Sequence, residues 1–196
     1  MEKVMVVAKS ALYAAGFEDE TGFFAGAFPA LTAAIVNSHI FMERGISETD
    51  YDYKQIIPYT VVKYKNKYLL LKRLSKQGEK RLHGMLSIGV GGHINENERQ
   101  GGETMLINGA LRELNEEVRV SFTKDPVFMG FLNDNEADVG RVHLGLVYLL
   151  AAEDGVFKIN EKDKMEGGWA AAGELAEKLP AMEGWSRILI ESGLIC

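Results

Sequence analysis

Residues 105–118 constrain this chain more than any other part of its sequence. Apolar residues recur there at helical spacing and predict one buried helix face: Ile107, Leu111, Leu114 and Val118. Glu113, Glu116 and Glu117 stand at positions i, i+3 and i+4, so their side chains share another face of the same helix. The sequence therefore predicts a helix that packs on a core and presents three carboxylates together.

The three carboxylates suggest a metal site. Like charges on one exposed helix face repel each other by roughly a few tenths of a kcal/mol per pair. Hard oxygen ligands are what Mg²⁺ and Mn²⁺ require, and such an ion would turn the repulsion into coordination. Taken alone, a run of charged residues is more commonly a solvated surface. The choice between a solvated surface and a metal site therefore depends on the neighbouring residues.

Two glycines and an arginine favour the metal site. Gly91 and Gly92 follow a predicted strand, and the lack of side chains lets a backbone carbonyl approach an ion or a phosphate. Arg112 stands beside Glu113 and four residues before Glu116, where a guanidinium can orient carboxylates.

The sequence R-E-L-N-E-E at 112–117, preceded by a glycine and a glutamate, resembles the Nudix box. That motif runs glycine, five residues, glutamate, seven residues, then R-E-U-x-E-E-x-G-U, where U is a bulky aliphatic residue. The positions that match its second half are Arg112, Glu113, Leu114, Glu116, Glu117 and Val120. As an order of elements, the resemblance extends over residues 56–179.

The sequence departs from the motif in two places. Arg119 stands where the motif has its second glycine, and six additional residues lengthen the loop before the arginine. Glu98 keeps the motif's distance from Gly92, whereas Glu103 lies in the sequence G-E-T that is typical of the family. We expect Glu103 to be the structural equivalent of the first box glutamate, with Glu98 as the alternative, so that residues 94–101 are an insertion. A longer loop costs little extra closure entropy, so the helix can keep its place.

The resemblance implies an α/β fold, the Nudix-type α/β/α sandwich with a mixed β-sheet. It also implies a hydrolase that uses Mg²⁺ or Mn²⁺ to cleave a diphosphate bond in a nucleoside diphosphate linked to another moiety. Glu116 and Glu117 would be the main metal ligands, assisted by Glu113 and the carbonyl of Gly91. Glu113 is the nearest candidate for the base that activates water, and it forms the expected catalytic group together with Arg112 and Glu116.

Four residues are candidates for contacts with substrate phosphate: Gly92, His93, Arg73 and Arg81. The two arginines flank the loop before the box strand, where a guanidinium can hold a phosphate in a bidentate manner. A solvent-exposed loop histidine and ordinary surface arginines are the alternatives for these positions.

Two other functions remain open. A Nudix-fold ligand-binding or regulatory domain could keep the pocket without turnover, and both Arg119 and the lengthened loop are compatible with that. An isomerase on the same fold would by resemblance need an active-site cysteine, and the single cysteine, Cys196, is far from the box in sequence. In every case the expected partner is a small-molecule diphosphate compound whose second moiety the sequence does not identify.

Strands and helices are expected to alternate irregularly along the chain. Residues 1–50 are expected to form an N-terminal extension that packs on or beside the core, and residues 51–196 the Nudix hydrolase domain. The extension should hold a strand at 4–8 and a helix at 30–44 that Pro29 opens. The expected elements of the main domain are a hairpin of strands 56–64 and 68–73, strands at 86–90, 127–132 and 142–150, and helices at 105–118, 173–179 and 185–192.

Composition narrows the partners. The chain has 196 residues, of which 46% are hydrophobic, and can supply a sizeable core. Its net charge of −6 argues against a nucleic-acid partner. No apolar run reaches the ~18 residues of a membrane span, and a single cysteine is typical of the reducing cytoplasm. A homodimer is compatible with these properties.

Overall fold

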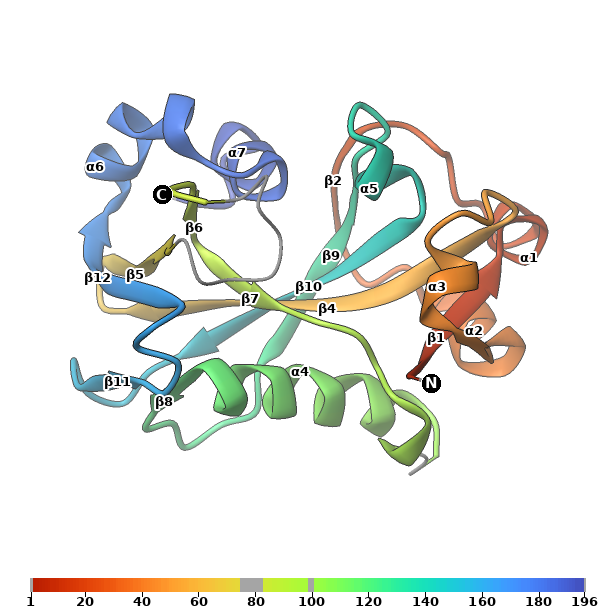
Figure 1. Cartoon of the computed structure of the whole chain (residues 1–196), viewed down its shortest axis with the longest axis horizontal. Helices are drawn as coiled ribbons and strands as arrows, with labels where there is room; N and C mark the ends of the chain where they lie inside the picture. The colour runs from red at the N-terminus through yellow and green to blue at the C-terminus, as the bar shows by residue number, and fades with distance from the viewer. Residues whose placement is uncertain (1, 75–82, 99–100, 196) are drawn as a thin grey trace.

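The computed structural model describes residues 2–74, 83–98 and 101–195. Its fold is organised around one long strand, β4 (Tyr53–Tyr64), which pairs with the parallel strand β10 (His143–Ala151) (Figure 1). The other edge of β4 is shared in turn by three antiparallel strands, β1 (Lys3–Ala8), β7 (Gly89–Gly91) and β5 (Lys67–Arg73). A different part of β4 therefore positions each of these strands.

The main sheet is mixed, and its strand order is β12–β5–β4–β10–β9–β2. β4 and β10 run parallel, and the other pairs within this order are antiparallel. The remaining strands are β2 (Gly22–Ala25), β3 (Ile40–Glu43), β6 (Leu86–Ser87), β9 (Val127–Asn133) and β12 (Met165–Ala171). A second, two-stranded sheet joins β8 (Val118–Val120) to β11 (Phe157–Ile159).

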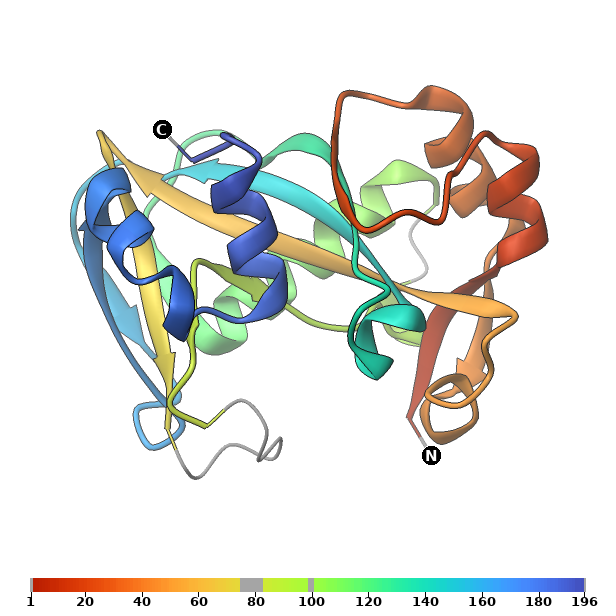
Figure 2. The ribbon, with the colours of Figure 1, turned by 90° about the horizontal axis from the view of Figure 1, so that it is seen from above.

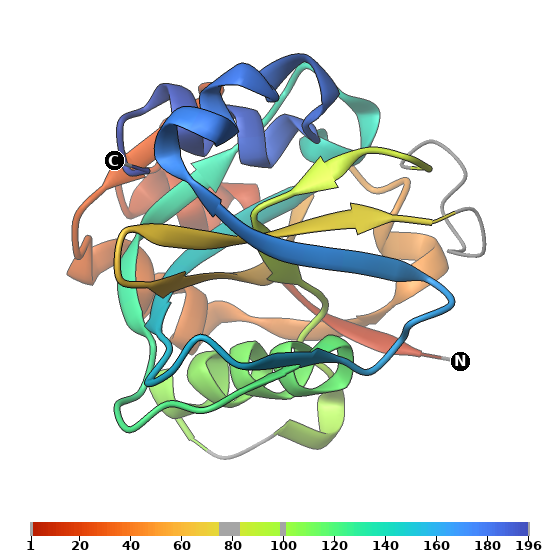
Figure 3. The same cartoon turned by 90° about the vertical axis from the view of Figure 1, so that its left-hand side faces the viewer.

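Helices cover both faces of the main sheet. α4 (Glu103–Glu117) lies against one face, and α6 (Ala172–Glu177) and α7 (Gly184–Glu191) lie against the other (Figure 3). Successive side chains of β10 point to opposite faces of the sheet. Leu146 packs in the core cluster that contains residues of α4, and Val147 packs in the cluster that contains residues of α7. The structure thus confirms the expected α/β/α sandwich with a mixed sheet.

The N-terminal segment contributes strands to this same sheet. β1 pairs with β4 and β3, and β2 pairs with β9. Seen from above, the segment lies at the opposite end of the sheet from α6 and β12 (Figure 2). Its helices are α1 (Lys9–Ala14), α2 (Pro29–Ser38) and α3 (Arg44–Ser47), and a further short helix, α5 (Asp138–Arg141), precedes β10.

The helix expected over residues 30–44 is wrong in its second half. α2 begins at Pro29 as expected, but it ends at Ser38, and the following residues form β3. Ile40 and Phe41 are β-branched and aromatic residues that suit a pleated surface, and they pair with β1 in antiparallel register. The non-local pairing outweighs the helical spacing of the apolar residues.

The other expected elements are present, with boundaries shifted by a few residues. One of them is divided: the strand expected over residues 86–90 forms β6, which pairs with β5, and β7, which pairs with β4. Within the described part of the chain, no helix is both long and apolar enough to cross a membrane.

Two residues allow α4 to lie close to β4. Pro58 falls between the stretches of β4 that pair with β1 and with β7, where a strand edge tolerates a residue without an N–H group. On the helix, a Cβ at Gly109 would lie 3.6 Å from Cγ of Pro58 and 2.9 Å from Cγ1 of Ile94. A larger residue at Gly109 would therefore push the helix away from the loop that holds Ile94.

A buried lysine connects the N-terminal segment to the core. Lys54, whose side chain is 0% exposed, forms an ion pair with Asp19 at 3.3 Å. Its Nζ also donates to Oδ1 of Asn133 at 2.8 Å, and to Oδ1 of Asn135 and the carbonyl of Gly140, both at 3.3 Å. Segments that are far apart in the sequence therefore meet at one ammonium group.

The two charged partners of this network have shifted pKa values. Burial lowers the pKa of Lys54 to about 8, although Asp19 opposes the shift. Burial alone would raise the pKa of Asp19, but the hydrogen bond from Asn135 and the charge of Lys54 hold it well below its usual range. A carboxylate with a lowered pKa in the folded state stabilises the protein above its usual pKa, and this contribution is lost as the pH falls below that value.

We predict that Asp19→Asn lowers the free energy of unfolding by about 1–3 kcal/mol at neutral pH, because it leaves the buried ammonium group of Lys54 without the counter-ion Asp19. The expected loss is limited because Asp19 is partly exposed, so that solvent screens its charge. Urea unfolding measures the effect, and the difference from wild type should narrow as the pH falls below about 4. Glu20→Gln, at the exposed neighbouring residue, is the matched control and should stay within about 0.5 kcal/mol of wild type. Equal stability of the two variants at neutral pH would contradict this role of Asp19.

Candidate active site

The C-terminal half of α4 places the acidic residues beside the end of β7. One side of the helix is buried through Met105, Leu106, Ala110 and Leu114. Leu114 belongs to the same core cluster as Val90 of β7, so the last turns of the helix are packed against that strand. The carboxylates of these turns consequently lie near the loop that follows Gly91.

The guanidinium of Arg112 joins the helix to this loop. Its Nη1 lies 2.8 Å from Oε1 of Glu113 and 2.9 Å from Oε1 of Glu116. Its Nε donates to Oε1 of Glu98, and its Nη2 donates to the backbone carbonyl of His93 at 2.6 Å. Although burial opposes it, the hydrogen bonds to Glu98 and Glu116 raise the pKa of Arg112 further, so the group stays charged.

The partner of Arg112 on the loop is Glu98, the alternative candidate for the first box glutamate, and not the preferred Glu103. Glu98 ends a short 3₁₀ helix (Glu96–Glu98), and its second carboxylate oxygen accepts the N–H of Asn95 at 3.1 Å. Glu103 is the first residue of α4. Nine residues at 1.5 Å each separate it from Arg112 by about 13 Å along the helix axis, which is too far for a direct ion pair. The additional residues therefore lie between Glu98 and Arg112.

Gly92 makes room for the carboxylate of Glu113. A Cβ placed on Gly92 would lie 2.0 Å from Cδ of Glu113 and 2.2 Å and 2.4 Å from its two oxygens. Any side chain at this position would occupy the space of the carboxylate. The second glycine of the pair is thus required by packing against the helix.

Glu117 is half-buried, and its charge interacts with those of other carboxylates. Burial raises its pKa to about 7, and the charges of Glu113, Glu161 and Glu183 act in the same direction, whereas Arg73 opposes them. Such a cluster is costly without a compensating cation. The pKa of Glu113 is raised as well, mainly by burial, with Arg112 acting against the shift.

The donor chemistry of this cluster fits a divalent cation, although the side chains would have to rearrange. As they stand, no three acidic or histidine side chains of the described residues converge closely enough to hold a metal ion. Arg112 draws Glu113 and Glu116 to itself. The side chain of Glu116 is 57% exposed, so it can turn toward Glu117 without disturbing the core. Gly91, whose carbonyl is the other candidate ligand, ends β7.

His93 and Arg73 are both held by other side chains of the protein. Nε2 of His93 donates to Oε1 of Gln55 at 2.7 Å, and burial lowers the pKa of the ring to about 3, so it is neutral. Nε of Arg73 donates to Oε1 of Glu183, and both side chains are largely buried. The fold therefore brings Arg73 to the acidic cluster and ties His93 to β4. Arg81 lies outside the described residues.

Arg119, which replaces the second glycine of the box, does not disturb the helix end. α4 ends at Glu117, and Val118 follows in extended conformation at the start of β8. Arg119 is exposed in this strand, opposite Lys158 of β11. Because the chain continues as a strand, no left-handed turn is needed at this position.

Glu161 and Glu183 were not among the residues that the sequence singled out. They lie far from the box along the chain, and their local sequences carry no motif. Glu183 reaches the site because its N–H donates to the carbonyl of Leu86 in β6 at 2.9 Å. Such contacts depend on the complete sheet, so the sequence pattern alone gave no signal for them.

Comparison with known proteins finds relatives that match most of the chain. No family model matches it. Protein YmaB of Bacillus subtilis (strain 168) is 34% identical over 168 residues, which cover 82% of this chain and 81% of the relative.

Among solved structures, Tm1382, described as a putative Nudix hydrolase, has a TM-score of 0.85 and 31% sequence identity, and the match covers 99% of this chain and 98% of the other. The bifunctional NMN adenylyltransferase/ADP ribose pyrophosphatase of Francisella tularensis, complexed with AMP and a Mn ion, has a TM-score of 0.54 and 16% identity. That match covers 72% of this chain and 41% of the other, and at this identity it shows the fold alone.

We predict that Gly92→Ala weakens Mn²⁺ binding by about tenfold or more, because the new methyl group displaces the carboxylate of Glu113. Titration calorimetry with Mn²⁺ measures the affinity, and circular dichroism checks the fold. Gly168→Ala is the matched control, since a Cβ there meets open space. Unchanged Mn²⁺ affinity in folded Gly92→Ala would show that the position of Glu113 does not matter for the ion.

The assignment of Glu98 can be tested against Glu103 directly. Glu98→Gln should weaken Mn²⁺ binding by about 10–100-fold, because a neutral amide holds Arg112 less firmly and Arg112 in turn orients two carboxylates. Glu103→Gln, on the same loop–helix segment, should bind like wild type in the same titration. The reverse result, with Glu103→Gln as the damaging change, would restore the original expectation.

Proposed function

The chain belongs to the Nudix hydrolase superfamily, and on that basis we propose that it uses Mg²⁺ or Mn²⁺ to cleave the diphosphate bond of a nucleoside diphosphate linked to a further moiety. The observation that carries this proposal is the arrangement around Arg112, which holds Glu113 and Glu116 on the helix, together with the half-buried carboxylate of Glu117, whose charge interacts with that of Glu113. A fully solvated acidic surface would not half-bury Glu117 next to like charges.

In this proposal Glu116, Glu117 and Glu113 would hold the ion together with the carbonyl of Gly91. Their oxygen atoms are the hard ligands that Mg²⁺ and Mn²⁺ prefer. When bound, the ion would neutralise charge on the phosphoryl oxygens and orient the diphosphate.

Glu113 would take the proton of the attacking water. The water oxygen attacks one phosphorus, the bond from that phosphorus to the bridging oxygen breaks, and two phosphate monoesters or related products leave. Arg112 and Gly92 fix the carboxylate of Glu113 in one place, and its burial raises its pKa and thus its proton affinity. A positioned base of this kind is the contribution of the protein to the proton transfer.

Arg73 would contact the phosphate groups of the substrate. Its ion pair with Glu183 holds the guanidinium beside Glu117, and a planar guanidinium can bind phosphate oxygens in a bidentate manner. The net charge of −6 supports a small phosphorylated compound as substrate in preference to a nucleic acid.

The proposal predicts that Glu117→Gln lowers the hydrolysis rate by about a hundredfold or more, the scale on which single electrostatic catalytic groups act. Wild type and variant are incubated with ADP-ribose, nucleoside triphosphates, a nucleoside diphosphate sugar and a dinucleoside polyphosphate, and products are followed by phosphorus NMR. Activity should require Mg²⁺ or Mn²⁺ and vanish with a chelator. Glu177→Gln, at an exposed residue of α6, is the matched control and should keep the wild-type rate.

Two outcomes would contradict the proposal. Hydrolysis that persists in the chelator would remove the metal from the reaction. Metal-assisted binding of one of these compounds without any product would favour a Nudix-fold ligand-binding or regulatory domain.

A further inference from the structure

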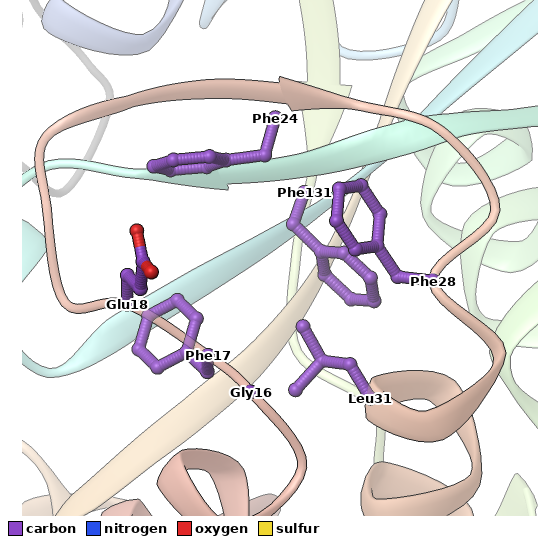
Figure 4. A pocket seen from close by; sticks show the side chains of 7 residues that line it. All are labelled: Gly16, Phe17, Glu18, Phe24, Phe28, Leu31 and Phe131. Carbon is purple, nitrogen blue, oxygen red and sulfur yellow. The ribbon is translucent and has the colours of Figure 1, made fainter.

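A cavity of about 220 Å³ lies between the N-terminal segment and β9, apart from the residues of the candidate active site (Figure 4). Figure 4 shows Phe24 on one side of this space, Phe17 and Leu31 on the other, and the Glu18 carboxylate at its rim. The rings of Phe28 and Phe131 lie next to each other at its end, with centroids 5.8 Å apart. The proposed hydrolysis makes no use of any of these residues.

The lining of this cavity favours a particular chemistry. Four of its side chains are phenylalanine rings, and Glu18 is the one charged group among the described lining residues. A phosphate or another anion would meet a carboxylate and no basic side chain there. A polar sugar would find little to hydrogen-bond with. An apolar or cationic group remains.

Glu18 favours the cation. Its neighbour Asp19 is already paired, with Lys9 at 3.1 Å and with Lys54 at 3.3 Å. For Glu18, the described residues provide no ion pair or hydrogen bond. Aromatic faces attract a cation through their quadrupole, and a carboxylate at the rim adds a full opposite charge. Together they form the kind of cage that recognises alkylated ammonium groups.

The backbone at Phe28 is bent to place its ring on the cavity. Phe28 has φ 41° and ψ 63°, a left-handed conformation that is unusual for a bulky residue, and the residue remains 41% exposed. Gly26, with φ 137°, approaches the same ring so closely that a Cβ there would lie 3.3 Å from it. This strained turn keeps the ring of Phe28 at the opening of the cavity, where the residue is only partly buried.

The size of the cavity limits the ligand. An apolar cavity of about 150 Å³ can take a benzene-sized molecule, whereas pockets for larger ligands usually measure about 300–1,000 Å³. A volume near 220 Å³ suits one compact group and excludes a nucleotide. From these observations we propose that the cavity bounded by Phe17, Phe24, Phe28, Phe131 and Glu18 binds the head group of an alkylated ammonium compound.

The test compares choline with dimethylbutanol, the uncharged carbon isostere of choline, by titration calorimetry and ligand-observed NMR on the full chain. Choline should bind saturably. The isostere should bind at least about tenfold more weakly than choline, because it lacks the charge that the rings and Glu18 attract. Equal affinities would show a merely apolar cavity, and absence of saturable choline binding would show no site. Either result overturns the proposal, and neither depends on hydrolase activity.

Variants connect the binding to this cavity. Glu18→Gln and Phe24→Leu should each weaken choline binding by about threefold to tenfold. Glu20→Gln, two residues from Glu18 and exposed, is the matched control and should bind choline like wild type. Because Phe24→Leu can also loosen the packing, the midpoint of its thermal unfolding is measured. If that midpoint falls below the wild-type value, only the choline affinity of Glu18→Gln is used to judge the proposal. Wild-type choline affinity in Glu18→Gln overturns the cation assignment.

Discussion

The ion pairs of Arg112 are the interaction on which the candidate site depends. The guanidinium is planar and carries five N–H donors, so it can bond to several oxygens in different directions at once. Here it meets Glu98 and the carbonyl of His93 on the loop and Glu113 and Glu116 on the helix. Without it, these carboxylates would repel one another, and only apolar packing such as that of Ile94 against Gly109 would hold the loop to α4.

The parts of this structure that the sequence predicted are those determined locally. The apolar spacing of α4 and the acidic positions beside it lie within one helix, so the period of the helix alone brings Glu113, Glu116 and Glu117 to one side. The hairpin of β4 and β5 is local in the same sense, because its turn joins neighbouring strands directly. The superfamily and the fold class were implied by the resemblance of residues 112–117 to the Nudix box, and the comparisons confirm both.

Non-local contacts explain what the sequence did not predict. Ile40 and Phe41 continue a helical pattern, but β1 offers them a strand partner that no local pattern reveals. In the sequence, Glu98 and Glu103 could be compared as partners of Arg112 only by their neighbouring residues. In the structure, Glu103 begins α4 and is separated from Arg112 by nine residues of helix, whereas Glu98 contacts Arg112 directly. Glu161 and Glu183 reach Glu117 through connections that follow the whole sheet. The burial of Lys54 likewise becomes visible only when β9 and the N-terminal segment surround it.

The parallel pairing of β4 with β10 has a consequence for how the chain folds. His143 pairs with Gln55, 88 positions earlier, so the centre of the sheet closes a long loop before its contacts can form. The β4–β5 hairpin can form early, but the edge of β4 that pairs with β10 stays unpaired until residues 143–151 have been synthesised. During that interval the strand has an open edge that other chains can join. We therefore expect aggregation through this edge to be a hazard chiefly during protein synthesis, before β10 is available to cover it.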